Sequence, residues 1–265
     1  MQRVFRIGQI VPSSNTTMET EIPAMLDAHA RVHGTRFTFH SSRMRMKTVR
    51  KEELAAMDGE SDRCALELSD ARVDVLGYAC LVAIMSMGKS YHRISQERLH
   101  GRTVENSAPA PVVTSAGALV DALHIIGAKS IAVVAPYMKP LTQLVVDYIE
   151  HEGVNVIDSR ALEIPDNIQV GRHDPAKLPG IVAGMSLQDA DAIVLSACVQ
   201  MPSLPSIAEV EARTGKPVIT AAVATTYAML KALNLSTRVP GAGALLSGAF
   251  DDQVMVSRTA RAHAG

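Results

Sequence analysis

Two of the chain's three cysteines, Cys80 and Cys198, each come directly after a short apolar run. A lone cysteine in such a run is most often inert core, because free cysteine is among the most buried residue types. Packing, however, gives no reason for the same residue to recur at the end of two similar runs. Two thiols presented from two similar segments therefore favour chemistry on both sides of one small substrate.

The ionisation of these thiols decides what they can do. An ordinary cysteine, with a pKa of about 8.5, is only a few per cent thiolate at pH 7. We expect a turn or a helix start after each of the two cysteines, where free N–H groups and the helix dipole favour a thiolate. A pKa lowered by about 1 to 2 units would make either thiol a competent nucleophile or base. Cys64 lies in a predicted helix without a counterpart, so we predict a structural role for it.

A polar loop, residues 12–19, follows the first predicted strand. Its Ser, Asn and Thr residues are typical of a helix cap. Five consecutive small hydroxyl or amide residues, from Ser13 to Thr17, exceed what a cap requires. They offer a neutral hydrogen-bonding cradle, with Ser14 and Asn15 at its centre, that can hold a carboxylate at a helix N-terminus. The two interpretations are compatible.

Two further polar residues follow strands of the second half. Tyr137 occupies the loop that matches the first one, and it either donates its phenol to a second carboxylate or lies at a rim. Asn167, in the loop of residues 165–172, either enters the same gap or is an ordinary turn residue.

Apolar, strand-like runs alternate with longer helical patterns. Strands are predicted at residues 5–11, 36–41, 73–79, 112–114, 130–135, 154–161, 192–197 and 218–221. Helical patterns between them include residues 51–71 and 141–152. Strands separated by helices of this length are typical of βαβ units and a mainly parallel sheet. The predicted fold class is α/β, with parallel sheets flanked by helices.

The second half of the chain resembles the first. Three matches keep the same order: residues 7–12 with 131–136, Cys80 with Cys198, and 111–116 with 217–222. We therefore predict two pseudo-symmetric lobes, residues 1–115 with 225–265 carrying Cys80, and residues 116–224 carrying Cys198. Ligands of open parallel sheets bind beyond the carboxyl ends of the strands, so the active site should lie between the lobes.

Composition excludes several classes of function. A net charge of −1 and a 3% aromatic content provide neither the field nor the stacking surfaces that nucleic acid needs. No apolar run is long enough to span a membrane, and the N-terminus lacks the h-region of a signal peptide. Three cysteines make no disulfide framework, which favours a reduced, cytoplasmic setting.

Cofactor motifs fail on inspection. Gly88-Lys89-Ser90 has the tail of a phosphate loop, but Ala83 stands where that loop needs its first glycine. No GxGxxG pattern follows the first strand, and the histidines show no metal-ligand spacing. We predict neither a cofactor nor a metal.

The segments 11–19, 78–80, 135–137 and 196–201, together with Asn167, resemble the maleate cis-trans isomerases, of the aspartate/glutamate racemase superfamily. The resemblance covers nearly the whole chain. It implies a cofactor-independent isomerase that acts on a small dicarboxylate and forms a homodimer. Two cysteines are typical of the superfamily, and the Ser-Ser-Asn-Thr loop points more narrowly to the isomerases.

The resemblance also implies roles for individual residues. Cys80 would add to the double bond of maleate, and rotation in the succinyl-type adduct followed by elimination would release fumarate. Cys198 would donate and recover the proton at the other carbon. Substrate-binding residues are predicted from the family's carboxylate-holding positions and their neighbours: Asn15, Tyr137, Asn167, Ser14, Val82 and Val199.

Three alternatives stay open. In a two-cysteine racemase of the amino acid or hydantoin type, the thiols would act as base and acid on opposite faces of one carbon. A decarboxylase of the arylmalonate type resembles a single-cysteine arrangement without the first cysteine. A non-catalytic carboxylate-binding protein of two closing lobes would have no use for either thiol.

Overall fold

Two four-stranded parallel sheets of the same topology form the frame of the molecule, in a computed structural model that describes residues 3–49 and 51–252. The first sheet has the order β2-β1-β3-β4 and the second the order β6-β5-β7-β8. Their strands are β1 (Val4–Pro12), β2 (Arg36–Met44), β3 (Val75–Tyr78), β4 (Val112–Thr114), β5 (Ser130–Ala135), β6 (Asn155–Ala161), β7 (Ala192–Ser196) and β8 (Val218–Thr220). All eight predicted strands are confirmed, and so is the α/β fold class.

Helices cover the sheets, as the alternating pattern predicts. They are α1 (Met18–His33), α2 (Lys51–Asp70), α3 (Leu81–Ser86), α4 (Tyr91–Glu105), α5 (Ser115–Ile125), α6 (Lys139–His151), α7 (Asn167–Gly171), α8 (Leu178–Ala183), α9 (Ile207–Thr214) and α10 (Ala221–Ala232). Short 3-10 turns lie at Pro175–Lys177, Leu204–Ser206 and Leu245–Ser247. Among the described residues, no helix combines the length and the apolar character that a bilayer span needs.

The strand ends differ from the predicted ones where pairing or backbone geometry decides them. β2 continues to Met44 because it pairs with β1 along its whole length, up to the pair Pro12 and Met44. The polar run before Met44 hides this continuation in the sequence. β3 ends at Tyr78 because the chain turns sharply two residues later, at Cys80.

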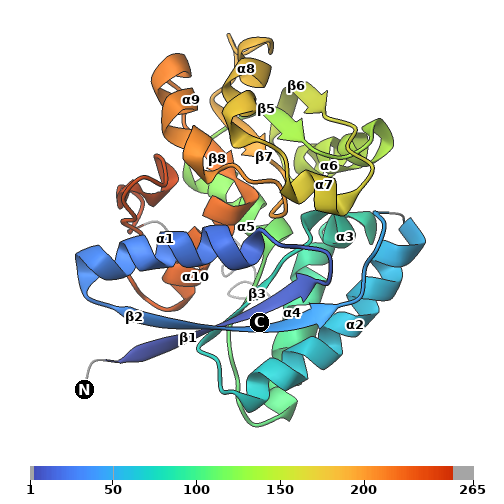
Figure 1. Cartoon of the computed structure of the whole chain (residues 1–265), viewed down its shortest axis with the longest axis vertical. Helices are drawn as coiled ribbons and strands as arrows, with labels where there is room; N and C mark the ends of the chain where they lie inside the picture. The colour runs from blue at the N-terminus through green and yellow to red at the C-terminus, as the bar shows by residue number, and fades with distance from the viewer. Residues whose placement is uncertain (1–2, 50, 253–265) are drawn as a thin grey trace, which may run out of the picture.

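We use "first lobe" for the β1–β4 sheet with α1–α4, and "second lobe" for the β5–β8 sheet with α6–α9 (Figure 1). Helices α5 and α10, which follow the equivalent strands β4 and β8, pack against each other and contact both of these strands. The predicted division at residue 225 cuts through α10, which also contacts α1 and β3. The domain boundaries stay a prediction, and their segment 253–265 lies outside the described residues.

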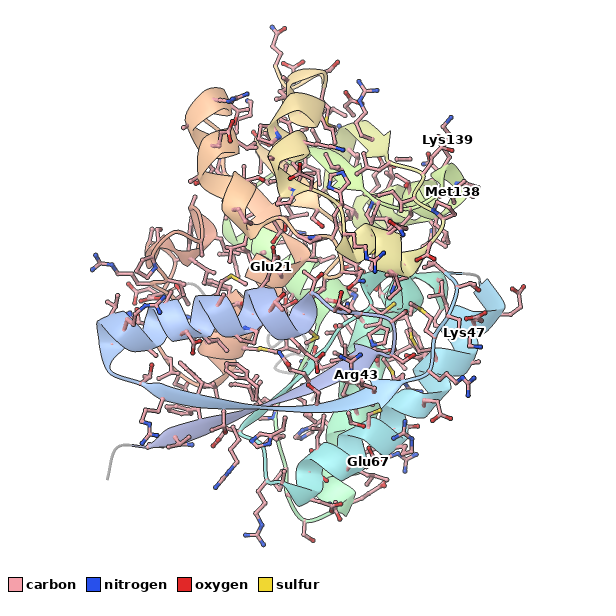
Figure 2. All side chains as sticks on the ribbon, in the orientation of Figure 1. Glu21, Arg43, Lys47, Glu67, Met138 and Lys139 are labelled. Atoms are coloured by element: carbon pink, nitrogen blue, oxygen red, sulfur yellow. The ribbon has the colours of Figure 1, made fainter. Side chains whose placement is uncertain are left out.

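Several hydrogen bonds join the two lobes, and two sets of them are made to carboxylates. On α1, the Glu21 carboxylate points toward the second lobe (Figure 2) and accepts the N–H groups of Ser203 at 2.6 Å and Leu204 at 2.7 Å. Between α4 and α6, Arg93 donates to both carboxylate oxygens of Glu152, at 3.0 and 2.7 Å. These contacts hold the carboxyl ends of the two sheets toward each other.

Candidate active site

Cys80 sits at the junction between β3 and α3 in a rare backbone conformation. Its φ of 97° and ψ of 67° lie in the left-handed region, which costs a residue with a Cβ about 1–2 kcal/mol. The residue before it, Ala79, is fixed to β1 because its N–H donates to the carbonyl of Ile10 at 3.0 Å. Strain of this kind persists where the surrounding structure enforces it, and it gathers at functional sites. The turn leaves the Cys80 side chain on the wall of a cavity between the lobes.

Cys198 ends β7 in the equivalent way. Ala197 donates its N–H to the carbonyl of Val134 at 3.0 Å, as Ala79 does to Ile10. The Ser196 hydroxyl donates to the Cys198 carbonyl at 2.7 Å and holds the turn. The Cys198 side chain lines the same cavity as that of Cys80.

The cavity brings together almost all the residues predicted from the sequence. Its lining consists of Pro12, Asn15, Met46, Val49, Cys80, Val82, Tyr137, Asn167, Cys198, Val199 and Gln200. Ser14 is not in the lining, but its hydroxyl accepts a hydrogen bond from Asn167 Nδ2 at 2.8 Å. The cavity measures about 20 Å³, enough for one or two water molecules at roughly 10–15 Å³ each.

The pKa values of the two thiols shift in the direction opposite to the one expected from the sequence. Burial raises the pKa of Cys80 to about 12, and the charges of Cys198 and Asp58 add to the rise, while the Ala83 N–H lowers it. Burial also raises the pKa of Cys198, although hydrogen bonds from Tyr137 and from the N–H groups of Gln200 and Met201 lower it. The predicted donors are present, at a helix start after Cys80 and in a turn after Cys198, but removal from water outweighs them.

Asn15 both caps a helix and lines the cavity. Its Oδ1 accepts the N–H groups of Thr17 and Met18, each at 3.0 Å, which fixes the plane of the amide at the start of α1. Its Nδ2 has no partner among the described residues and is free to donate. Arg43, at the end of β2 (Figure 2), donates to the carbonyls of Ser13 and Asn15 at 3.0 and 3.2 Å. These bonds fix the backbone of the loop of residues 12–17.

Tyr137 lies inside the site rather than at its rim, with 5% of its surface exposed. Its hydroxyl donates to the Ala197 carbonyl at 3.1 Å and is also within hydrogen-bonding reach of the Cys198 thiol. Burial, reinforced by the charges of both cysteines, raises the pKa of Tyr137 well above its ordinary value. The phenol therefore stays protonated and acts as a donor.

Sequence reasoning did not assign Gln200, Met46 or Val49 to the site. Gln200 follows Cys198 by two residues beyond the end of β7, so its polar character at a carboxyl-end loop was an available signal. Met46 and Val49 lie in the connection between β2 and α2 and carry no signal that sets them apart from core residues.

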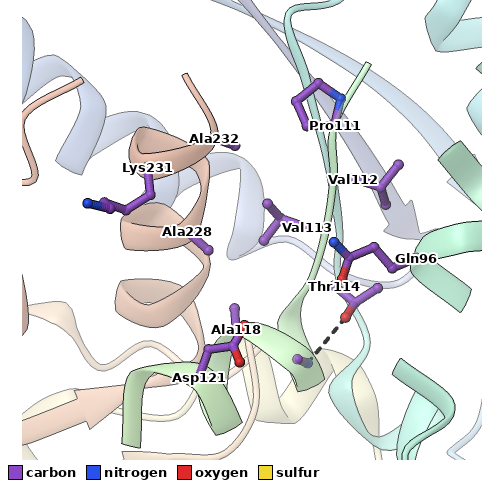
Figure 3. A pocket seen from close by; sticks show the side chains of 11 residues that line it. Gln96, Pro111, Val112, Val113, Thr114, Ala118, Asp121, Ala228, Lys231 and Ala232 are labelled. Atoms are coloured by element: carbon purple, nitrogen blue, oxygen red, sulfur yellow. Dashed lines mark hydrogen bonds between the residues drawn. The ribbon is translucent and has the colours of Figure 1, made fainter. Parts of the chain in front are cut away.

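A second cavity lies away from the cysteines, between β4 and helices α5 and α10 (Figure 3). It is lined mainly by apolar and small side chains such as Val113, Ala118 and Ala228. The Thr114 hydroxyl in its wall accepts the N–H of Gly117 at 3.2 Å and serves as a helix cap. Within the described residues, no group of three or more His, Cys, Asp or Glu side chains is placed to hold a metal ion.

Comparison with known proteins places this geometry in a family. The sequence model of the arylmalonate decarboxylase family matches residues 7–246. A maleate isomerase of Pseudomonas putida is 73% identical over 250 residues, which is 94% of this chain and 100% of the relative. A maleate isomerase of Geobacillus stearothermophilus is 60% identical, with the same coverage.

Solved structures agree. A cysteine-to-alanine variant of a Pseudomonas putida maleate isomerase, solved with maleate, has a TM-score of 0.92 at 70% identity and covers 93% of this chain and 99% of its own. A cysteine-to-serine variant of the Nocardia farcinica maleate cis-trans isomerase, with a covalently bound succinylcysteine intermediate, has a TM-score of 0.89 at 45% identity and covers 92% and 99%. The chain therefore belongs to the arylmalonate decarboxylase family and, within it, to the maleate isomerases.

Proposed function

We propose that the chain converts maleate into fumarate without a cofactor, with Cys80 as the nucleophile and Cys198 as the acid and base. One observation carries this proposal: two thiols from equivalent strand ends line a single cavity whose other polar residues are uncharged. Thiolates suit addition to an electron-poor double bond, and a dianionic substrate needs hydrogen-bond donors at both ends. Relatives named maleate isomerase support the same reaction.

The steps balance without an external reagent. The Cys80 sulfur, as thiolate, bonds to C2 of maleate, and the π electrons move to C3, which takes the proton of Cys198. C2–C3 is now a single bond, and rotation about it brings the carboxylates to opposite sides. The Cys198 thiolate then removes the proton from C3, the double bond re-forms and the C2–S bond breaks. Fumarate leaves, and both sulfurs return to their starting states.

The raised thiol pKa values give this cycle a constraint. Free thiolate is scarce at neutral pH when burial raises the pKa of Cys80 to about 12. The cycle therefore starts from the small ionised fraction of Cys80, and because elimination releases Cys80 again as a thiolate, each turnover needs no further deprotonation of this residue. In the Nocardia farcinica variant, a succinylcysteine intermediate is bound covalently, which supports the adduct in this chain's cycle.

The remaining lining residues hold the substrate. Asn15 offers its free Nδ2, Tyr137 its phenol and Asn167 its amide to the two carboxylates. Ser14 acts through its hydrogen bond to Asn167, while Val82 and Val199 form apolar walls beside the alkene and keep water from the adduct. Rotation requires that one carboxylate be held more loosely than the other.

Two coarser features complete the proposal. We place the enzyme in the cytoplasm because its cysteine usage suits a reduced compartment. We also propose a homodimer, on the basis of the family resemblance.

Conversion of maleate by the purified chain tests this function. We expect fumarate to accumulate in buffer with a chelator and without nicotinamide, and Cys80→Ser and Cys198→Ser each to lower kcat by at least roughly a hundredfold. Circular dichroism of both variants serves as the folding control. If no fumarate forms, or if Cys80→Ser retains full activity, the proposal is wrong.

A further inference from the structure

Gln200 is a buried amide at the point where three segments of the site meet. Only 2% of its surface is exposed, and it follows Cys198 in the turn after β7. Its Oε1 accepts the N–H of Thr16 at 2.8 Å, and its Nε2 donates to the carbonyls of Ser14 at 3.1 Å and Asn167 at 2.8 Å. These bonds cross from the second lobe to the first.

All the principal bonding groups of this amide are used by the protein. Nε2 has two hydrogens and makes two bonds, and Oε1 already accepts one. Gln200 therefore lines the cavity without a donor to offer a substrate. Two of its partners, Ser14 and Thr16, flank Asn15 in the chain, and the third is Asn167 itself. Asn15 and Asn167 are the two amides that we assign to the substrate carboxylates.

We infer that Gln200 is a positioning residue, which sets the separation of Asn15 and Asn167 and so matches the site to a dicarboxylate. This inference rests on the proposed function. The Gln200 amide joins the loop of residues 12–17 to the start of α7 as a bridge. It fixes Asn15 because it bonds the two neighbours of Asn15 in the chain, and it fixes Asn167 because it bonds the carbonyl of that residue. The adjacent bond from Asn167 to the Ser14 hydroxyl closes the same bridge on its other side.

Gly171 provides the space that the bridge occupies. A Cβ added to this residue, the last of α7, would lie 2.5 Å from Gln200 Nε2 and 2.8 Å from Thr16 Oγ1. Both atoms are side-chain ends that can swing away, so the fold tolerates the added methyl group while the bridge does not. A larger residue at position 171 thus removes the hydrogen bonds of Gln200 without changing Gln200 itself.

Steady-state kinetics of Gln200→Met and Gly171→Ala test the inference. Methionine keeps the side-chain length and loses all three bonds, whereas alanine at 171 displaces the amide. We expect each variant to raise KM for maleate by roughly tenfold or more, with kcat changed much less, because a misplaced carboxylate donor weakens substrate and transition state alike. Gly180→Ala on α8 is the matched control, since a Cβ there meets nothing within 4 Å and should leave KM unchanged.

Hydrogen exchange of the Thr16 amide gives a second readout that a general loss of stability would not reproduce. We expect this amide to exchange faster in both variants, while amides in β1 keep their protection. The inference is wrong if the variants retain the KM of the unaltered chain, or if KM rises with Thr16 still protected. If the unaltered chain itself makes no fumarate, the proposed function fails first, which separates the two outcomes.

Discussion

Cys80 and Cys198 line one cavity from the ends of equivalent strands, and yet their backbones differ. The alanine before each donates its N–H at 3.0 Å to the matching strand, β1 or β5. Cys80 then turns into the left-handed region, while Cys198 is not among the residues of positive φ that the structure describes. A duplicated framework thus presents two thiols in unequal ways, which suits one nucleophile and one acid and base.

Backbone strain at Cys80 predicts an inverted order of stability at this position. The free energy of unfolding of Cys80→Gly, measured with urea, should exceed that of Cys80→Ala by about 1 kcal/mol, because glycine adopts a φ of 97° without a Cβ clash. At Cys198 we expect the usual order, with alanine the more stable. An alanine variant at position 80 as stable as the glycine variant would contradict the strain.

The raised pKa of Cys80 predicts how its reactivity depends on pH. Only the thiolate is alkylated, so the rate of reaction of Cys80 with iodoacetamide should rise about tenfold per pH unit from pH 7 to 10. Peptide mass spectrometry resolves Cys80 from the other two cysteines. A rate that levels off near pH 8 would show that burial does not raise the pKa in solution.

A buried carboxylate behind Cys80 tunes this reactivity. Asp58 accepts hydrogen bonds from the hydroxyl of Tyr78 at 2.9 Å and from Arg98 at 3.0 Å, and its charge contributes to the raised pKa of Cys80. Asp58→Asn should therefore lower that pKa and speed alkylation at pH 8. Asp62→Asn, which alters a carboxylate paired with the same Arg98, is the control and should leave the rate close to that of the unaltered chain.

We expect Tyr137 to contribute to catalysis through its hydroxyl and not through its ring. Tyr137→Phe keeps the ring in the cavity and removes the hydroxyl that donates to the Ala197 carbonyl, reaches Cys198 and is proposed to bind a substrate carboxylate, so kcat/KM for maleate should fall roughly tenfold to a thousandfold. The pKa of Cys198 should rise further, because the hydroxyl that lowers it is gone. An unchanged kcat/KM in the Tyr137→Phe variant would show that this hydroxyl has no part in substrate binding or catalysis.

Two contacts between the lobes, of His92 on α4 with the Tyr148 hydroxyl on α6 and of Arg93 with Glu152, predict a loss of stability in acid. Burial and the charge of Arg93 lower the pKa of His92 to about 4, so its neutral form stabilises the fold above pH 6.5 and that contribution is lost as the pH falls to 4. Burial alone would raise the pKa of Glu152, but hydrogen bonds from Arg93 and Ser90 outweigh it and lower the pKa to about 2. Its contribution is lost between pH 4.5 and 2.

Urea unfolding at several pH values measures this effect. The free energy of unfolding should fall by up to about 1.4 kcal/mol per pH unit from His92 between pH 6.5 and 4. His92→Gln should flatten that slope, while His151→Gln, at an exposed position, should not. An equal slope in the His92 variant would assign the acid sensitivity to other groups.

The sequence predicts the frame of the site well, because topology decides it. Apolar runs of the right length became strands, and parallel strands bring their carboxyl ends to one edge, so the loops that carry Asn15, Tyr137 and Cys198 meet. The duplicated order of these motifs predicted two similar sheets, which the strand orders bear out.

Other features depend on three-dimensional surroundings that no local pattern encodes. The left-handed turn at Cys80 occurs at a residue type that rarely adopts it. The thiol pKa values follow from burial among distant segments, which outweighs the local helix start. Gln200 belongs to the site because two loops from different lobes close around it.

Trapping the adduct tests the central claim most directly. The Cys198→Ser variant, incubated with maleate and analysed by intact mass and peptide mapping, should gain the mass of one maleic acid on Cys80. Water or the serine hydroxyl can protonate the strongly basic C3, whereas the step that removes this proton again lacks the Cys198 thiolate as its base. The matched Cys80→Ser variant should gain nothing. An unmodified Cys80 in a folded Cys198→Ser variant, with fumarate still formed by the unaltered chain, would contradict covalent catalysis by this thiol.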